Sequence, residues 1–280
     1  MSIRFLTDSA SDILPEEAKA LGITVAPISV TFGEETYADG VTIGHQEFYE
    51  KLAKSETLPS TSQINPAIYE DYFNELTANG DEVVVVTLSS GLSGTYQSAM
   101  IAAADFEGKV YVVDSMNATV GQRILLLRGL ELAKQGWSAA EIADALNEEK
   151  GKIRVMAIID TLEYLKKGGR ISATVALAGG LLAIKPAVQI KDGKVALAGT
   201  ARGVKKCHAL LTELIEQYGG VNFDKPMALV YADDDALLRQ FISDNPQLWQ
   251  GHDNLPAYGL GCTIGAHIGP NAYGVAFFEK

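Results

Sequence analysis

Hydroxyl groups, glycines and a helix start are combined in residues 89–95, Ser-Ser-Gly-Leu-Ser-Gly-Thr. The segment follows consecutive valines at 83–86, which predict a buried strand, and a helix is predicted from about Ser93. Ligands bind at the carboxyl ends of parallel strands, and the N–H groups of a helix N-terminus suit an anion. Gly94 would let a ligand approach the backbone, and Ser93 could donate its hydroxyl to a carboxylate. The alternative, that Ser90 or Ser93 is only a helix N-cap, stays open.

Two other segments carry more hydroxyls than plain connections require. In residues 59–63, Pro-Ser-Thr-Ser-Gln, Thr61 and Ser62 could donate to an anion or belong to the cap of the following helix. Residues 7–12, Thr-Asp-Ser-Ala-Ser-Asp, follow the first predicted strand, where such side chains commonly bond to nearby backbone groups. For Asp8 we favour that local role over contact with a ligand.

His267 lies in a glycine-rich segment, residues 261–270, where a lone histidine is more often structural than catalytic. A serine-dependent acyl hydrolase or transferase would use Ser93 as nucleophile and His267 as base, but no third triad member can be identified. The nucleophile-elbow motif also fails, because Thr95 replaces its last glycine. No Cys/His cluster has metal-ligand spacing, so we expect no metal. Neither nucleotide-binding glycine motif is present, so nucleotide binding has no support.

The elements that would position these residues alternate through the first half of the chain. Strand, helix, strand and helix joined by short links predict a parallel sheet with helices on both faces. The predicted strands are 3–8, 23–32, 82–88 and 109–113, and the predicted helices are 15–21, 45–54, 66–78, one from about 93, and 120–134.

The second half predicts a mixed sheet, because it contains a β-hairpin as well as interspersed helices. Asp192-Gly193 joins two short β-rich runs and is typical of a tight hairpin turn. We therefore expect an α/β protein of two lobes at 1–151 and 152–280, with a soft boundary. The predicted strands are 153–159, 186–191, 194–198, 227–232 and 273–278, and the predicted helices are 162–169, 204–218 and 235–243.

The composition, with 47% hydrophobic and 21% charged residues, is that of an ordinary soluble protein. A net charge of −12 argues against broad nucleic-acid binding. Residues 175–184 form the longest nearly unbroken apolar run, about half of what a bilayer-spanning helix needs, so stable membrane insertion is not expected. Two cysteines and an N-terminus that turns polar after six residues favour a cytoplasmic location.

Two basic clusters stand out on this acidic chain. Lys166, Lys167 and Arg170 form the first, and Arg202 with Lys205 and Lys206 forms the second. A solvated face usually explains such clusters, although they could also dock a phosphate or an acidic partner.

Taken together, the order and spacing of these segments resemble the DegV family of bacterial lipid-binding proteins. Ile64 departs from the family pattern, in which a proline is frequent at this position, and this could alter the loop slightly without removing a donor. The matching segments run nearly end to end: residues 7–12, 59–63, 88–96, 113–115, 162–171, 185–186, Arg202 and 265–270.

The resemblance implies one family domain spanning about residues 3–279, with a long-chain fatty acid such as palmitate or oleate buried between its two lobes and no other cofactor. It further implies a lipid-binding subunit of bacterial fatty acid kinase that has no activity alone. A separate ATP-dependent kinase subunit would convert the presented carboxylate into an acyl-phosphate. The resemblance assigns the carboxylate to Thr61, Ser62, Ser93, the Gly94 N–H and His267, and contact with the kinase to Arg170 and Arg202.

Elementary energetics agree with this assignment. A buried carboxylate is costly unless several donors satisfy it, and the hydroxyls, a helix N-terminus and one histidine would do so without a fixed cation. A dozen buried methylenes would contribute roughly 10 kcal/mol before ordering costs. The acyl hydrolase using Ser93 and His267, and a lipid-sensing regulatory protein, remain alternatives.

Overall fold

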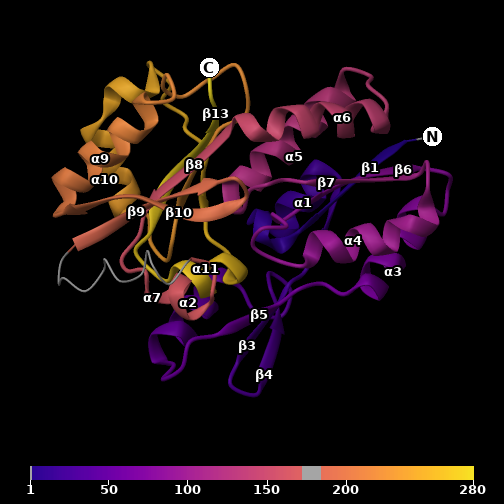
Figure 1. Ribbon diagram of the computed structural model, residues 1–280, viewed down its shortest axis with the longest axis horizontal. Coiled ribbons are helices and arrows are strands. Elements are labelled where there is room, and N and C mark those ends of the chain that lie inside the picture. Colours follow the sequence, from indigo (N-terminus) through magenta and orange to yellow (C-terminus); the bar gives the residue numbers. More distant parts are fainter. Residues whose placement is uncertain (1, 172–183) are drawn as a thin grey trace.

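The valines at 83–86 lie at the centre of a four-stranded parallel sheet. The structure, a computed structural model, describes residues 2–171 and 184–280 (Figure 1). The strand order is β2-β1-β6-β7, and every pair is parallel. The bounds are β1 (Ile3–Asp8), β2 (Ile23–Ala26), β6 (Glu82–Thr87) and β7 (Val110–Asp114).

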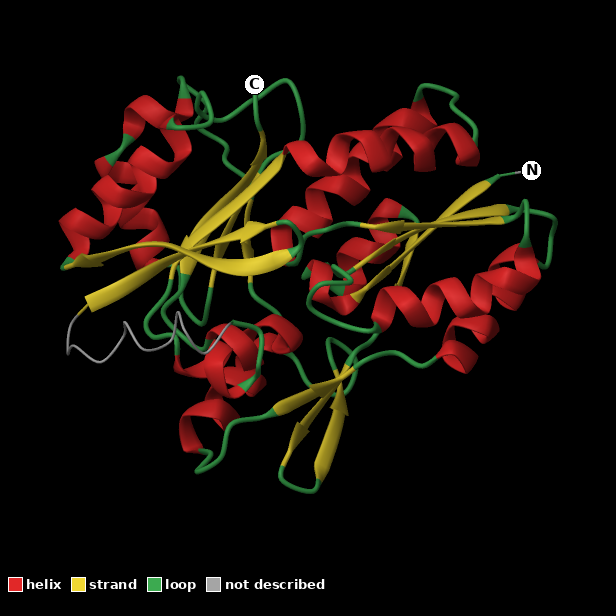
Figure 2. Cartoon of the chain, viewed as in Figure 1, coloured by secondary structure: helices red, strands yellow, loops and turns green. Residues whose placement is uncertain are grey.

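Helices cover both faces of this sheet, which is why the valines are buried (Figure 2). Val83 and Val85 pack with apolar side chains of α3 and α4, whereas Val84 and Val86 face those of α5 and α6. The helices that pack against this sheet are α1 (Pro15–Leu21), α3 (Pro66–Thr77), α4 (Thr95–Ala103), α5 (Thr119–Lys134) and α6 (Ala139–Glu149).

The second large sheet has the order β10-β9-β8-β13-β11-β12 and is mixed, since β11 and β12 are parallel and the other pairs antiparallel. The predicted hairpin is confirmed, with Asp192 at φ 50° and Gly193 at φ 73° in its turn. The strands are β8 (Ile153–Ile158), β9 (Ile184–Lys191), β10 (Lys194–Arg202), β11 (Ala228–Tyr231), β12 (Ala257–Gly259) and β13 (Tyr273–Phe278), with α9 (Val204–Glu216) and α10 (Ala236–Asp244) packed on one face.

Residues 23–32, predicted as one strand, instead form two strands in different sheets, so that prediction is wrong. β2 ends at Ala26 and pairs with β1, whereas β3 (Ser29–Phe32) belongs to a small third sheet. Pro27 separates them, and because it has no N–H and a fixed φ it ends the strand ladder.

The third sheet, which the sequence did not predict, is antiparallel with the order β4-β3-β5. It comprises β3, β4 (Glu35–Ala38) and β5 (Ser60–Ser62). Residues 60–62 are therefore an edge strand and not a helix cap. The cap of α3 is Asn65, whose side chain accepts from the backbone N–H of Ile68 at 3.0 Å.

Three short helices lie between the small sheet and the six-stranded sheet (Figure 1). They are α2 (His45–Lys54), α7 (Glu163–Lys167) and α11 (Cys262–Ile268). α11 contacts both of the other helices as well as β3 and β5, so a C-terminal helix packs against N-terminal strands. This packing brings His267 to the hydroxyl-rich residues 60–62.

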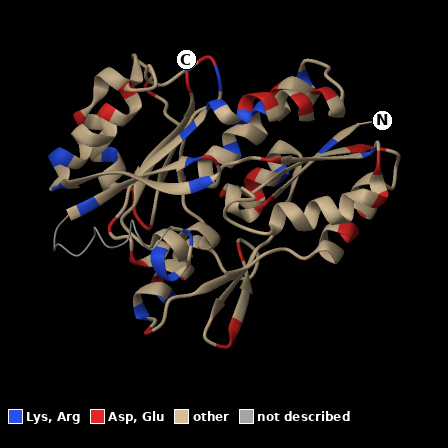
Figure 3. Ribbon diagram, in the orientation of Figure 1, with Lys and Arg blue, Asp and Glu red and all other residues tan. Residues whose placement is uncertain are grey.

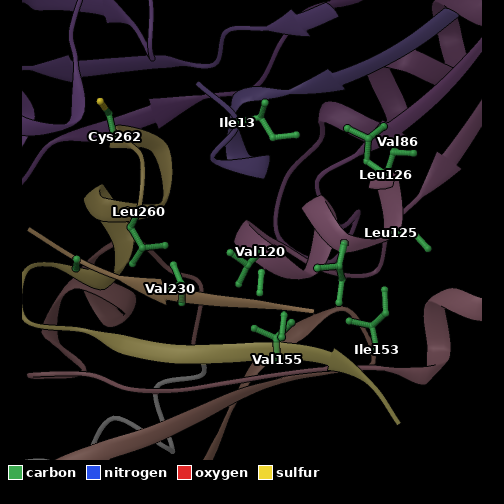
Figure 4. Close-up of a cluster of buried hydrophobic side chains, with 14 of the residues drawn as sticks. Ile13, Val86, Val120, Leu125, Leu126, Ile153, Val155, Val230, Leu260 and Cys262 are labelled. Atoms are coloured by element: carbon green, nitrogen blue, oxygen red, sulfur yellow. The ribbon is translucent and has the colours of Figure 1, made fainter. Parts of the chain in front are cut away.

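The largest apolar cluster joins the two large sheets through α5. Val120 on α5 points toward Val155 and Val230 of the mixed sheet (Figure 4). The predicted α/β fold, with a parallel sheet first and a mixed sheet second, is confirmed. The strands of the two sheets come from residues 3–114 and 153–278, which supports our proposal of lobes at 1–151 and 152–280.

The apolar run 175–184, noted in the sequence, lies outside the described residues except for Ile184. Within residues 2–171 and 184–280, no helix combines the length and the apolar character needed to cross a membrane.

Candidate functional site

A cavity of about 250 Å³ lies where the carboxyl ends of the parallel strands meet the mixed sheet and α11. Leu88 and Thr119 follow strands β6 and β7, whereas Val155, Val188 and Val230 come from the mixed sheet. Apolar side chains dominate the lining, so the cavity suits a hydrocarbon ligand. The aliphatic residues are Ile28, Leu88, Leu92, Val155, Leu165, Val188, Ile190, Val195, Val230, Leu260, Ile264 and Ile268.

A small set of polar groups interrupts this apolar lining. It includes all five residues to which the resemblance assigned the carboxylate, brought together from three separate elements. β5 carries two of them, the turn before α4 carries two, and α11 carries one. They are Thr61, Ser62, Ser93, Gly94 and His267.

Thr61 and His267 are joined directly, with Thr61 Oγ1 2.8 Å from His267 Nε2. Burial, and secondarily the positive charge of Arg170, lowers the pKa of His267 to about 4. The imidazole is therefore neutral at physiological pH. If Nε2 carries its proton, the ring donates to Thr61 Oγ1, and the Thr61 hydroxyl hydrogen can then point to a bound carboxylate.

The segment before α4 is fixed by hydrogen bonds on several sides. Leu88 N–H donates to Asp8 Oδ2 at 2.7 Å, and Ser89 Oγ donates to the carbonyl of Gly193 at 2.7 Å. Asp8 also accepts from Ala10 N–H, in agreement with its predicted local role, and it does not line the cavity. Buried polar contacts thus hold this segment in place beside the cavity.

α4 begins at Thr95, two residues later than predicted, with Gly94 at its N-cap position. Ser93 Oγ accepts from the Thr95 N–H at 3.2 Å and lies 2.9 Å from Thr95 Oγ1. Ser93 therefore satisfies the first helical N–H and also lines the cavity, so the two interpretations of this residue are compatible. The alternative N-cap, Ser90, precedes the helix by five positions.

Gln63 is a cavity residue that sequence reasoning did not single out. Its Nε2 donates to Ser98 Oγ at 3.2 Å, and its amide lies directly on Gly94. A Cβ at position 94 would be 1.9 Å from Gln63 Oε1, so any other residue there would displace this amide. The signal available in the sequence was its place directly after the hydroxyl run, but nothing there indicated contact with Gly94.

The two arginines assigned to a partner lie in different surroundings. Arg170 lines the cavity, where Nε donates to the Leu92 carbonyl at 3.1 Å and Nη1 to the Gly168 carbonyl at 2.6 Å. A positive charge therefore lies at the cavity, although the expected carboxylate donors include no fixed cation. Arg202 is exposed at the end of β10, in a surface groove that also contains Lys206. Lys and Arg residues are coloured blue along the ribbon where β10 ends and α9 begins (Figure 3).

The geometry does not favour the acyl hydrolase that would use Ser93 and His267. Ser93 Oγ is bonded to Thr95, His267 Nε2 is bonded to Thr61, and within the described residues no hydrogen bond joins Ser93 to His267. Such an enzyme needs a nucleophile within hydrogen-bond reach of its base. In the same part of the chain no group of His, Cys, Asp and Glu is placed to hold a metal ion.

Fold and site together define a two-lobed α/β protein with an aliphatic cavity that carries hydroxyl and imidazole groups. The sequence model of the family described as "Uncharacterised protein, DegV family" matches residues 2–280, and the chain belongs to this family. A DegV domain-containing protein from Deinococcus radiodurans is 35% identical over 280 residues, covering 99% of this chain and 98% of that protein.

Two solved structures share the whole fold. A DegV family protein from Thermus thermophilus, described as fatty-acid-binding, has a TM-score of 0.89 and 31% identity, with 100% of both chains covered. A stearic acid-binding protein from Eubacterium ventriosum has a TM-score of 0.89 and 28% identity, covering 100% of this chain and 99% of that one.

Proposed function

We propose that this protein binds a long-chain fatty acid such as palmitate or oleate in its internal cavity. The acyl chain occupies the aliphatic part, and the carboxylate is held by Thr61, Ser62, Ser93, the Gly94 N–H and His267. The observation that carries the proposal is the convergence of these groups, from three separate elements, on an otherwise apolar cavity. The similar proteins from Thermus thermophilus and Eubacterium ventriosum, described as binding fatty acids, support it.

The chemistry of the polar groups suits a carboxylate. Hydroxyls and backbone N–H groups can donate to both oxygens, which offsets the cost of removing the anion from water. Arg170 adds a positive charge at the cavity, although its guanidinium already donates to two backbone carbonyls. The neutral His267 orients the Thr61 hydroxyl, so it contributes a donor without a second charge.

We further propose that the loaded protein works in the cytoplasm as the lipid-binding subunit of a fatty acid kinase. It would present the carboxylate to an ATP-dependent kinase subunit, with Arg170 and Arg202 at the contact. The exposed Arg202, next to Lys205 and Lys206 at the start of α9, is a basic surface suited to an acidic partner. Under this proposal the chain alone makes no acyl-phosphate.

The first test is native mass spectrometry of the freshly purified protein, followed by denaturation and lipid extraction. We expect a stoichiometric fatty acid that is lost in the double variant Thr61→Ala/Ser93→Ala. A protein that is empty and does not take up added palmitate or oleate would overturn the proposal. Turnover of a chromogenic acyl ester that disappears in Ser93→Ala would instead favour the hydrolase.

The kinase step has its own test. The oleate-loaded protein is incubated with ATP and a purified fatty acid kinase subunit, and acyl-phosphate is trapped as a hydroxamate. Arg202→Glu is expected to abolish the product without changing oleate affinity. Arg239→Glu, which changes an exposed arginine on α10, is the matched control and should behave as wild type. Saturable oleate binding with no kinase-dependent product would indicate a lipid sensor.

A further inference from the structure

Two buried carboxylates from the first half of the chain cap the first turn of α11. Asp39 Oδ1 accepts from the Cys262 N–H at 3.1 Å. Its Oδ2 accepts from the Thr263 N–H at 3.0 Å and from Thr263 Oγ1 at 2.6 Å. Asp12 Oδ1 accepts from the Gly261 N–H at 2.9 Å. Three successive backbone N–H groups at the start of this helix are thus held by two side chains that are 3% exposed.

Both aspartates lie outside the aliphatic cavity. Asp39 follows strand β4 and Asp12 follows the 3₁₀ helix Ser9–Ser11, and neither residue lines the aliphatic cavity. α11, by contrast, supplies four lining residues, and His267 stands in its last turn. The lining residues of α11 are Thr263, Ile264, His267 and Ile268.

The sides of α11 are fixed by steric contact. A Cβ at Gly265 would lie 2.6 Å from Phe48 Cε1 and 2.9 Å from the Tyr49 hydroxyl, so α2 approaches the helix backbone closely. A Cβ at Gly168 would lie 2.3 Å from His267 Nδ1. Packing therefore limits sideways movement, whereas the carboxylates at the first turn fix the helix along its axis.

We infer that Asp39, assisted by Asp12, is a positioning residue for His267 in the carboxylate-binding group of the cavity. This inference rests on the proposed fatty-acid binding. Both aspartates act through the helix and do not touch the ligand. A charge-assisted bond to a helix N–H is short and directional, and it is favoured further by the helix dipole. Without it, α11 can shift along its axis, and the 2.8 Å contact between His267 and Thr61 is lost.

The test is a double-mutant cycle between Asp39 and His267. In Asp39→Asn one of the two carboxylate oxygens becomes an NH₂, which cannot accept from the Cys262 or Thr263 donor that it faces, so part of the cap is lost with little change in shape. We expect oleate affinity, measured by displacement of cis-parinaric acid, to fall about tenfold. In a His267→Gln background the same substitution is expected to cost less than about twofold, because the group it positions is already gone.

A purely structural role for Asp39 gives a different result. It would lower affinity by the same factor in both backgrounds, and that additivity would overturn the inference. Asp71→Asn, an exposed substitution on α3 that removes the same charge, is the control and should leave affinity unchanged. Oleate binding to the wild type is measured first, since its absence would refute the proposed function, whereas normal binding by Asp39→Asn would refute only the positioning role.

A spectroscopic readout accompanies the affinities. The chain has 4 histidines, so the ¹³Cε1 signal of His267 can be assigned by its disappearance in His267→Gln. We expect this signal to shift in ligand-free Asp39→Asn and to stay in place in Asp71→Asn. An unmoved signal in Asp39→Asn would contradict the inference.

If Asp39→Asn does not fold, Asp12→Asn takes its place in the same cycle. Asp12 also accepts from Thr119 Oγ1 at 2.5 Å. An asparagine can keep Gly261 N–H as donor to its Oδ1 and donate Nδ2–H to Thr119, so folding is expected to survive, whereas the bond to Gly261 loses the charge assistance of a carboxylate. The expected loss of oleate affinity is about threefold, again reduced in the His267→Gln background. Equal losses in both backgrounds would again overturn the positioning role.

Discussion

His267 Nε2 lies 2.8 Å from Thr61 Oγ1, which joins the last turn of α11 to the edge strand β5 across 206 positions of the sequence. The Thr61 hydroxyl can donate to a carboxylate, and the His267 ring can set the direction in which it does so. Together they form a donor group whose orientation is set by a neutral ring. Because the two come from opposite ends of the chain, the proposed carboxylate-binding group is complete only when the N-terminal strands and the C-terminal helix have packed together.

Removing the Thr61 hydroxyl should test this pair most directly. Thr61→Val keeps the shape of the side chain but leaves His267 Nε2 without its partner. We expect oleate affinity to fall about tenfold and the free energy of unfolding to fall by about 1–2 kcal/mol. Fluorescence titration and urea unfolding measure the two effects. The control is Thr36→Val, on exposed β4 of the same small sheet, and an equal loss of affinity there would contradict a specific role for Thr61.

The lowered pKa of His267 predicts a pH dependence of stability. Burial, and then the charge of Arg170, lowers this pKa from 6.5 to about 4, so the folded protein resists protonation while the unfolded chain accepts it. The unfolding free energy therefore falls as the pH drops from 6.5 toward 4. The full effect is up to about 3 kcal/mol, at about 1.4 kcal/mol per pKa unit.

Other buried groups act in the opposite direction, so the prediction is made for a difference between two proteins. Burial raises the pKa of Asp8 to about 6 and that of Asp12 to about 7, and each favours the folded state more as the pH falls through its folded pKa. Asp8 and Asp12 are also present in His267→Gln, so their contributions cancel in the difference in unfolding free energy between wild type and this variant. Relative to that variant, wild type should lose stability between pH 6.5 and 4 in urea unfolding, and a constant difference would contradict a buried neutral His267.

The sequence predicted the long buried strands better than it predicted where strands end and which sheet each one joins. Long apolar runs such as residues 83–86 mark a buried strand whatever surrounds them. Pro27 splits residues 23–32 between two sheets, and the short β5 depends on pairing with β3 far from it in the sequence. Such edge strands are specified by tertiary partners and not by local periodicity, which is why the third sheet was missed.

The candidate site shows the same division. All five residues to which the resemblance assigned the carboxylate line one cavity, and four of them lie in the hydroxyl- and glycine-rich segments that the sequence itself marked. Gln63 and the cavity position of Arg170 were missed, since each depends on a contact between separate elements. The capping of α11 by Asp39 was missed for the same reason. Nothing in the sequence around Asp39 indicates that it contacts a helix more than 220 residues later.

Filling the apolar part of the cavity should separate lipid binding from folding. Val188 on β9 is 5% exposed and lines the cavity, so Val188→Phe places a ring in the space proposed for the acyl chain. We expect oleate binding to fall by at least about tenfold, with a change of stability below about 1.5 kcal/mol because the ring enters an existing space. Val188→Ala, which enlarges the cavity, should still bind. Equal affinities in both variants would place the acyl chain elsewhere.

The last prediction concerns the close contact between the Gln63 amide and Gly94. A methyl group at position 94 would lie 1.9 Å from Gln63 Oε1, and the amide is the mobile end of its side chain. Gly94→Ala should therefore push the Gln63 amide toward the residues proposed to bind the carboxylate, with little change in the free energy of unfolding. We expect oleate affinity to fall about tenfold, because the displaced Gln63 amide would crowd the bound carboxylate and disturb its hydrogen bonds. Fluorescence titration and thermal unfolding of the same samples separate the two effects.

The cause of that loss can be checked by removing the side chain that is displaced. Gln63→Ala leaves room for the new methyl group, so the double variant Gly94→Ala/Gln63→Ala should bind oleate more tightly than Gly94→Ala alone. Recovery of this kind arises only when the two residues compete for one space, because independent losses would add. A double variant weaker than either single one would mean that the backbone at Gly94 itself, and not the Gln63 amide, is what the methyl group disturbs.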